Sequence, residues 1–401
     1  MGTAHGTATI DETTRGVDWD EADRAARALR EEFLLDPEVI FLNHGSFGAC
    51  PRPVFEEYQR WQMELERQPV DFLGRRSEGL LTEARQVLAG YLNVDLDTVV
   101  YVTNATSGLN VIARSLPLER DDEVLTTDHE YGALNMTWEW MCGKTGAHYV
   151  RHPIPLPVTS RAELVESFWS AVTPRTKVIF LSHITSPTAL ILPVKEICDR
   201  AREAGILTVV DGAHAPSQIP LDLDNLGVDI YSGNNHKWLC APKGSGFLYA
   251  RPEHHDWIES LPISWGWQGE HTFITRNQRQ GTRDLAPYLA TPAAIRFQLE
   301  RDWDTVRVRC HELAREARRR VADLGGIAPL SPDSPDWFSQ MIALPLPPHD
   351  PGKLKTRLYD DFHIEAPVGA WRDWTMIRLS FQGYNTHDDL DAVLNALARI
   401  L

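Results

Sequence analysis

The sequence has few cysteines, no long apolar run and no cluster of basic residues. Its five cysteines are spread over 401 residues without a C-x-x-C pair, a set that predicts neither a disulfide framework nor a zinc knuckle. No stretch approaches the roughly 18 apolar residues of a membrane helix, and the polar first sixteen residues lack the apolar core of a signal peptide. We therefore expect a protein of the reducing cytoplasm with no membrane partner.

The charge balance argues against one further class of partner. The sequence contains 40 Lys and Arg residues and 56 Asp and Glu residues, which gives a net charge of −16. This sign repels nucleic-acid phosphates, so nucleic acid is not an expected partner. The remaining composition, with 43% hydrophobic residues, is ordinary globular usage, and the length suits two or three domains or one large α/β layer with a smaller companion.

Several familiar signatures are also missing. The chain has no G-x-G-x-x-G after a strand, no P-loop and no G-x-S-x-G, so dinucleotide binding, P-loop chemistry and the serine-hydrolase elbow lose their main support. The histidine pairs His254/His255 and His148/His152 lack a third ligand nearby, and no metal site is expected.

Residues 98–250 alternate short β-branched runs with amphipathic stretches, the pattern of strand–helix–strand units. Between two strands, apolar residues from Val194 to Ala204 recur at helical spacing, and Gly205 follows as a C-terminal cap. This pattern predicts an α/β core with a mostly parallel sheet. The seven strands expected are Thr98–Thr103, Glu123–Thr127, Ala147–His152, Lys177–Ser182, Ile206–Asp211, Asp229–Ser232 and Gly246–Ala250.

Elsewhere the pattern changes. Helices are expected at Pro53–Gln68 and Val308–Leu324, and a third at Thr386–Leu401, where Thr386 and Asp389 have the spacing of a capping box. Strands are expected at Gln340–Leu344, ahead of a proline cluster, and at Met376–Phe381. The C-terminal third should therefore be a small α+β domain with an antiparallel sheet.

Two polar segments follow predicted strand ends, where open α/β sheets bind ligands. Asp211 closes an apolar strand in V-D-G-A-H, and Lys237 follows the next strand in S-G-N-N-H-K-W. Either residue alone is ordinary. Together they match what pyridoxal phosphate chemistry needs, because a lysine must form a Schiff base and an aspartate must keep the pyridine nitrogen protonated.

These two segments, with F-L-N-H-G-S-F-G, T-N-A-T-S-G, D-H-E-Y-G and S-H-I-T-S-P, resemble the class V aminotransferase branch of fold type I pyridoxal-phosphate enzymes. Within it the chain most resembles the isopenicillin N epimerase-like group, from about residue 30 to the C-terminus. The resemblance implies an aspartate aminotransferase-like fold, with a large domain around a seven-stranded sheet and a smaller C-terminal domain. The expected division is a flexible tail (1–17), a segment near the small domain and active site (18–50), a large cofactor-binding domain (51–285) and the small domain (286–401).

The resemblance also assigns the ring contacts of pyridoxal 5′-phosphate. Lys237 matches the Schiff-base lysine and α-proton shuttle, Asp211 the pyridinium partner, and His214 a contact to the ring hydroxyl. His129 matches the residue that stacks on the ring, with Tyr131 in reserve. Ser186 or Thr185 would make the second hydroxyl contact, where relatives often carry Asn.

Phosphate contacts are implied at three places. Ala105, Thr106 and Ser107 open a helix and form the expected cradle. Ser232, Asn235 and His236 compete for a second contact, because the lysine loop is two residues longer than the S-G-H-K form of cysteine desulfurases. Thr282 matches a residue that a neighbouring subunit contributes, which implies a homodimer with shared active sites.

The substrate side follows in the same way. Arg378 matches the arginine that binds the substrate carboxylate, and Asn43 and His44 match the segment that lines the substrate side. The tryptophans of Trp265–Trp267 either add an aromatic wall or belong to the core. The substrate would be an amino acid or an amino-acid conjugate, with no metal involved.

One absence narrows the reaction. Residues 365–374 contain no cysteine, although cysteine desulfurases of this branch carry their nucleophile there, so desulfuration is disfavoured. Epimerisation at the α-carbon is the first hypothesis, and a carbon–sulfur β-lyase of specialised metabolism is the second. Transamination and decarboxylation stay open, as does the acid–base group opposite Lys237, for which His44, Tyr131 and water are candidates. A silent scaffold or a Ser/His/Asp hydrolase fits less well, since Lys237, Asp211 and Arg378 are all retained.

Overall fold

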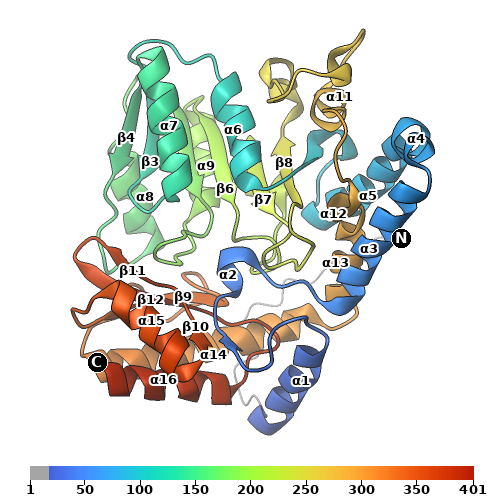
Figure 1. Ribbon diagram of the computed structural model, residues 1–401. Helices are drawn as coiled ribbons and strands as arrows, with labels where there is room; N and C mark the ends of the chain where they lie inside the picture. Colours follow the sequence, from blue (N-terminus) through green and yellow to red (C-terminus); the bar gives the residue numbers. More distant parts are fainter. Residues whose placement is uncertain (1–17) are drawn as a thin grey trace.

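The computed structural model describes residues 18–401, so the predicted tail 1–17 lies outside the described residues. A seven-stranded sheet forms its largest layer (Figure 1). The strands run in the order β2-β8-β7-β6-β5-β3-β4, and β8 is antiparallel to both its neighbours while all other pairs are parallel. In chain order they are β2 (Val99–Val102), β3 (Glu123–Thr127), β4 (His148–His152), β5 (Thr176–Ser182), β6 (Leu207–Gly212), β7 (Ile230–Asn234) and β8 (Gly246–Ala250). The predicted strands are confirmed, with ends shifted by up to two residues.

Helices cover both faces of this sheet, because successive side chains of a buried strand point to opposite sides. In β5, Val178 and Phe180 pack in the cluster with helices α6 and α7, whereas Ile179 and Leu181 pack in the cluster with α5 and α9. The helices of the large layer are α3 (Arg52–Arg67), α5 (Ser77–Leu92), α6 (Ala105–Ser115), α7 (Gly132–Thr145), α8 (Arg161–Trp169), α9 (Val194–Glu203), α11 (Phe273–Gln278), α12 (Ala286–Leu289) and α13 (Thr291–Leu299). Gly205 has φ of +67°, as expected for the residue that follows a helix.

The C-terminal part forms the predicted α+β unit. Its antiparallel sheet has the order β11-β12-β9, built from Val368–Trp371, Trp374–Ser380 and Met341–Leu346. Helices α14 (Trp303–Gly325), α15 (Pro351–Phe362) and α16 (His387–Ile400) pack with this sheet, and α16 begins with the predicted Thr386/Asp389 capping box.

Two predicted boundaries in this part are wrong. Helix α14 begins at Trp303, five residues before the predicted start. Strand β9 continues through Pro345, which was expected to end it. Proline is tolerated there because β9 is an edge strand, where a missing N–H leaves no ladder bond unmade. The remaining predicted elements, α3 among them, agree to within two residues.

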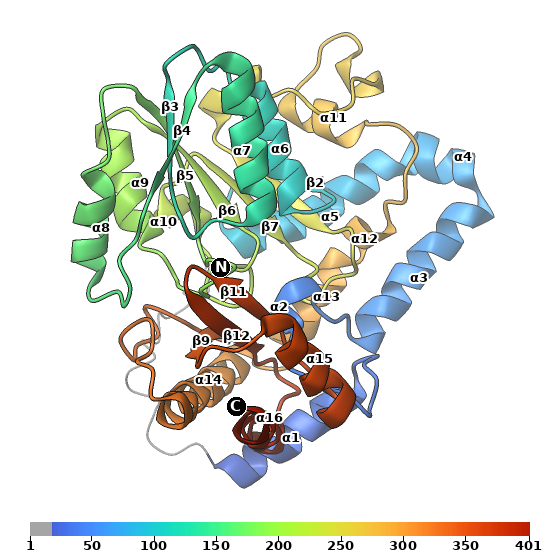
Figure 2. The same ribbon diagram turned by 60° about the vertical axis from the view of Figure 1, so that its left-hand side comes forward.

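The N-terminal segment connects the two parts. Helix α1 (Trp19–Glu31) joins the C-terminal unit, where Arg309 donates to the carbonyl of Ala22 at 2.6 Å. Strand β1 (Ile40–Phe41) pairs with β10 (Ile364–Glu365), and the short helix α2 (His44–Phe47) lies at the junction in both views (Figures 1 and 2). Within residues 18–401 no helix is long and apolar enough to cross a membrane. The division at 50/51 and 285/286 stays a prediction.

Candidate active site

The candidate active site forms where strands β5, β6 and β7 end. In register, Asp211 of β6 lies beside Ser182 of β5 and Ser232 of β7, and Lys237 follows β7 in the next turn. Because parallel strands end at one edge of the sheet, the aspartate and the lysine are brought together there.

The Lys237 amine lies 3.2 Å from Nε2 of His214, and the indole N–H of Trp238 donates to Nδ1 of the same ring at 3.3 Å. Burial, with the charges of Lys237 and Arg378, holds the pKa of His214 well below its usual value, so the ring is neutral. Since Nδ1 accepts, the proton sits on Nε2, and this N–H can only donate to an unprotonated lysine amine. Burial and Arg378 lower the pKa of Lys237 to about 7, against the opposing charge of Asp211.

Asp211 retains one carboxylate oxygen for a ligand. The side chain is buried, and its Oδ1 accepts the N–H of Ala213 at 2.8 Å. No hydrogen bond from the described residues is made to its Oδ2. Burial raises the pKa of Asp211 to about 6, while the Ala213 hydrogen bond and Lys237 oppose the rise. A cationic N–H placed at Oδ2 would favour the ionised form.

His129 presents a neutral, buried ring. Its Nδ1 lies 2.7 Å from the hydroxyl of Thr188, and its Nε2 has no hydrogen-bond partner in the part of the chain that the structure describes. Burial lowers the pKa of His129 to about 4. Tyr131, the reserve candidate, directly precedes α7 and is 45% exposed.

The start of α6 is arranged to hold an anion. The side-chain oxygen of Asn104 accepts the N–H of Ser107, and that of Asn234 accepts the N–H of Ala105, both at 2.8 Å. The N–H of Thr106 has no partner among residues 18–401. A free N–H at the positive end of a helix is a phosphate donor.

Among residues 18–401, two of the three candidates in the lysine loop keep a polar atom without a hydrogen-bond partner: Asn235 its side-chain oxygen and His236 its Nε2. Ser232 donates to the carbonyl of Phe247 at 2.7 Å, and Asn235 donates to the hydroxyl of Ser245 at 3.1 Å. His236 uses Nδ1 on the carbonyl of Ser245 at 2.9 Å, which leaves Nε2 available. Asn234 was not predicted, although strand alternation places it on the same side of β7 as Ser232 and nearer the strand end.

Arg378 lies on β12 and is half-buried. One terminal nitrogen donates to the carbonyl and hydroxyl of Ser186, at 2.7 and 3.2 Å, and the other to the hydroxyl of Ser46 at 3.3 Å. Burial lowers the pKa of Arg378 to about 10, so the group stays cationic at neutral pH. Ser186 therefore contacts the arginine, while the hydroxyl of Thr185 lies 2.7 Å from that of Thr188.

The N-terminal candidates differ from each other. Asn43 donates to Glu365 at 2.9 Å and accepts from the hydroxyl of Ser46 at 2.5 Å, which connects it to Arg378. His44 is fully buried, and burial lowers its pKa to about 3. Its Nε2 lies 3.0 Å from the carbonyl oxygen of Lys237. In this structure the His44 ring contacts the backbone of the lysine, and its place on the substrate side stays a prediction.

The segment around Thr282 lies on the surface of the single chain. Thr282 is exposed and Trp265 is 73% exposed, so Trp265 is not a core residue. Trp267 is partly buried and donates its indole N–H to Ser260 at 2.9 Å.

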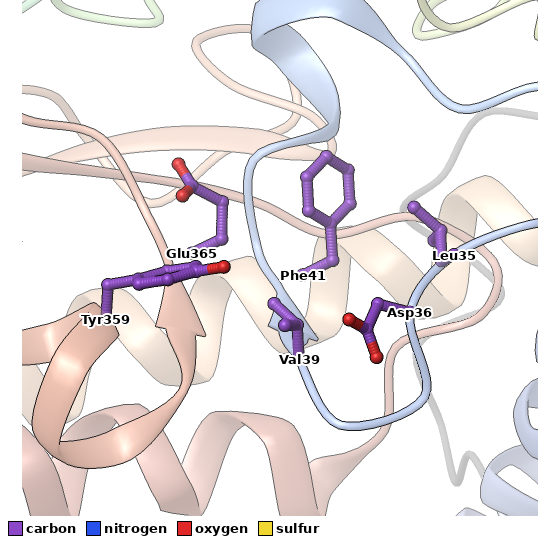
Figure 3. A pocket seen from close by; sticks show the side chains of 6 residues that line it. All are labelled: Leu35, Asp36, Val39, Phe41, Tyr359 and Glu365. Atoms are coloured by element: carbon purple, nitrogen blue, oxygen red, sulfur yellow. The ribbon is translucent and has the colours of Figure 1, made fainter.

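A separate hollow lies between β1 and α15 (Figure 3). It does not include Lys237, Asp211 or Arg378. Its lining residues are Leu35, Asp36, Val39, Phe41, Tyr359 and Glu365.

These donors fit pyridoxal 5′-phosphate. Lys237 offers a free amine, Asp211 an oxygen for the ring N–H, His214 an N–H for the ring oxygen, and Thr106 a backbone N–H for the phosphate. The fold and this set define a fold type I pyridoxal-phosphate-dependent enzyme. Over residues 50–393 the sequence matches the family described as Aminotransferase class-V, and the chain belongs to this family.

The curated relatives are named as isopenicillin N epimerases, cysteine desulfhydrases, a probable cysteine desulfurase and a hercynylcysteine sulfoxide lyase. Isopenicillin N epimerase of Streptomyces clavuligerus is 38% identical, over 95% of this chain and 98% of the relative. A putative L-cysteine desulfhydrase 1 of Oryza sativa is 27% identical, over 94% of this chain and 86% of the relative. Among solved structures, a cysteine desulfurase from Thermococcus onnurineus has the same fold, with a TM-score of 0.80 at 21% identity, over 93% of this chain and 97% of that one.

Proposed function

We propose that the chain moves the α-proton of an amino acid or a peptide-like amino-acid conjugate, as an enzyme similar to isopenicillin N epimerase. The observation that carries this proposal is the buried Lys237 amine, which lies 3.2 Å from Nε2 of His214 and has its pKa lowered to about 7 by burial and by Arg378. The 38% identity to a named isopenicillin N epimerase, over 95% of this chain, also supports the proposal. When bound, the cofactor supplies an aldehyde for amines and a ring that withdraws electrons from the α-carbon.

The chain's own residues would divide the remaining work. Arg378 binds the substrate carboxylate through its two terminal nitrogens, and Asp211 keeps the ring nitrogen protonated. Lys237 then takes the α-proton. Its pKa near 7 suits a general base at neutral pH, because half of the amine is unprotonated there.

Epimerisation also needs a group that returns the proton on the opposite face. We propose Tyr131 for this role, or a water molecule that it holds. The tyrosine is 45% exposed and lies close enough to Arg378 to affect the pKa of the arginine. His44 is not a candidate, since its ring is buried behind the lysine.

A carbon–sulfur β-lyase is the second candidate, favoured by the relatives named as cysteine desulfhydrases. Here the same α-proton leaves, the Cβ–S bond breaks with its electron pair, and a thiol is released. We propose that desulfuration through a protein persulfide does not occur. Residues 365–374 hold no cysteine, and burial raises the pKa of Cys50 and Cys198 to about 12 and that of Cys142 to about 11.

We further propose a cytoplasmic homodimer of specialised metabolism, with Thr282 reaching the phosphate of the neighbouring subunit. Exposure of Ile263 (80%) and Trp265 (73%) beside this segment supports a contact surface there. All five cysteines are free thiols, which suits a reducing compartment.

The deciding experiment uses the cofactor-loaded enzyme in D₂O with isopenicillin N and with S-alkyl-L-cysteines. We expect deuterium to appear at the α-carbon of isopenicillin N, which NMR detects. We also expect the configuration of this carbon to invert, which chiral chromatography detects. Release of a thiol and a keto acid from the cysteine conjugates without inversion would instead select the lyase. Failure of the wild type to exchange any α-proton, with no cofactor attached to Lys237, would overturn both.

A further inference from the structure

A hairpin of the C-terminal sheet contacts the cofactor-binding side. Strands β11 and β12 are joined by Arg372 and Asp373, and Trp371 pairs with Trp374 at the tip. In Figures 1 and 2 this hairpin points toward the loops below the large sheet. Arg372 has φ of +50°, in the left-handed region that costs energy for a residue with a side chain. A contact must therefore compensate for this conformation.

That contact is an ion pair with Asp128, the residue before His129. Arg372 donates from Nε to Oδ2 of Asp128 at 3.1 Å, and its Nη2 donates to the same oxygen and to the carbonyl of Ile154, the latter at 3.0 Å. Oδ1 of Asp128 accepts the N–H of Ile154 at 3.0 Å. The hairpin tip is thus tied to the loops that follow β3 and β4.

The ion pair also fixes the rings beside it. The Arg372 guanidinium lies 4.4 Å from the ring centre of Trp371, and the Trp371 ring lies 4.6 Å from that of His129 at an angle of 58°. Oδ1 of Asp128 is 3.6 Å from Nε2 of His129. Trp371 and Asp128 therefore both lie against the His129 ring, and Arg372 contacts each of the two.

The proposed substrate arginine, Arg378, lies on β12, one of the two strands of this hairpin. It is bonded to Ser186, while Thr188, two residues further on, contacts Nδ1 of His129. The hairpin and the 186–188 loop hold His129 and Arg378 together. Residues 365–374, which would carry the nucleophile of a desulfurase, are used here for contacts.

We propose that Arg372 and Asp128 are a positioning pair. Their ion pair holds Trp371 against His129 and so sets the angle of the His129 ring on the face of the bound cofactor. The inference rests on the proposed position of the cofactor against His129. Neither residue of the pair reaches the reacting atoms, so both act through the histidine.

The test compares Arg372→Ala, Asp128→Asn and the double variant with wild type. A matched control is Arg357→Ala, which removes an exposed ion pair with Asp361 on α15. The readouts are the visible circular dichroism of the cofactor bound at Lys237, kcat and KM. We expect both single variants to weaken the dichroism and to lower kcat about fivefold or more, with the double variant no worse than either, as for coupled residues.

Conservative variants guard against loss of folding. Trp371→Phe should retain most of the dichroism, and Trp371→Ala should reproduce the Arg372→Ala spectrum. An unchanged dichroism and kcat beside a lower melting temperature would overturn the inference, because the pair would then be a structural tie alone. Additive losses in the double variant would also overturn it. A wild type that neither binds the cofactor at Lys237 nor exchanges α-protons would instead overturn the proposed function, and the inference with it.

Discussion

Nε2 of His44 lies 3.0 Å from the carbonyl oxygen of Lys237, across 193 residues of sequence. On the other side of the ring, Nδ1 of His44 lies 2.9 Å from the hydroxyl of Tyr384. Gly48 packs against the same lysine backbone, where an added Cβ would overlap the carbonyl of His236. The N-terminal segment therefore holds the lysine from behind.

Replacement of Gly48 by alanine tests this arrangement. At φ of +70° and with backbone in the way, the new Cβ should cost about 1–3 kcal/mol of unfolding free energy. Urea denaturation measures it, and Gly74→Ala is the control, since nothing lies within 4 Å of its added Cβ. Equal effects of the two substitutions would contradict the proposed packing.

Loss of the lysine amine should abolish covalent attachment of the cofactor. Lys237→Ala is expected to lack a borohydride-reducible chromophore and to lose about 10²–10⁴-fold in turnover, the range for a general base, while keeping its melting temperature. Lys195→Ala, which alters an exposed ion pair with Asp199, is the control. Substantial turnover by Lys237→Ala would rule out the assigned role.

The lowered pKa of Lys237 predicts a pH dependence. Attachment of added pyridoxal phosphate to the cofactor-free protein should speed up with a midpoint near pH 7, since only the neutral amine reacts. Stopped-flow absorbance measures this rate. A midpoint near the ordinary value of 10.5 would mean that burial does not shift the amine.

Stability should follow with a defined sign. Between pH 7 and 10.5 the unfolded chain binds more protons at Lys237 than the folded chain, so this group makes stability rise with pH in that window. Below pH 7 both states are protonated and its contribution is constant. The difference in unfolding free energy between cofactor-free wild type and Lys237→Met isolates it, and a difference that stays flat from pH 7 to 10.5 would refute the prediction.

Asp211 should matter for affinity and for proton transfer together. Asp211→Asn removes the charge that would pair with the ring nitrogen, so cofactor binding should weaken and α-proton exchange should slow by about 10²-fold or more. Asp222→Asn, at the exposed cap of α10 (Leu223–Leu226), controls for surface charge. An unchanged exchange rate at saturating cofactor would argue against the pairing.

Arg378 should act on the substrate carboxylate. Arg378→Lys keeps a positive charge but loses the planar guanidinium group that can donate to both carboxylate oxygens. We expect KM to rise about tenfold or more, consistent with loss of a charge-assisted hydrogen bond. A substrate with its carboxylate converted to an amide is the control, because its reaction should be equally slow with both enzymes. If Arg378→Lys slowed only the reaction of the amide substrate, the arginine would have another role.

Local pattern was enough for the strands and for the polar residues at their ends. Asp211 and Lys237 could be found because each follows a β-branched run. Hydrophobic periodicity depends on neighbours a few residues away, and those neighbours decide strand position and face. Asn234 was missed because its neighbours Ser232 and Asn235 are also small polar residues, and the sequence pattern does not distinguish the three.

Local sequence patterns thus account for the α/β core and the C-terminal α+β unit, and they supply the prediction of the cofactor-site residues. The contact of His44 with the Lys237 backbone and the ion pair of Arg372 with Asp128, 244 residues apart, arise from tertiary packing. Such contacts depend on how two sheets pack, and no local spacing encodes the approach of side chains so distant in the chain.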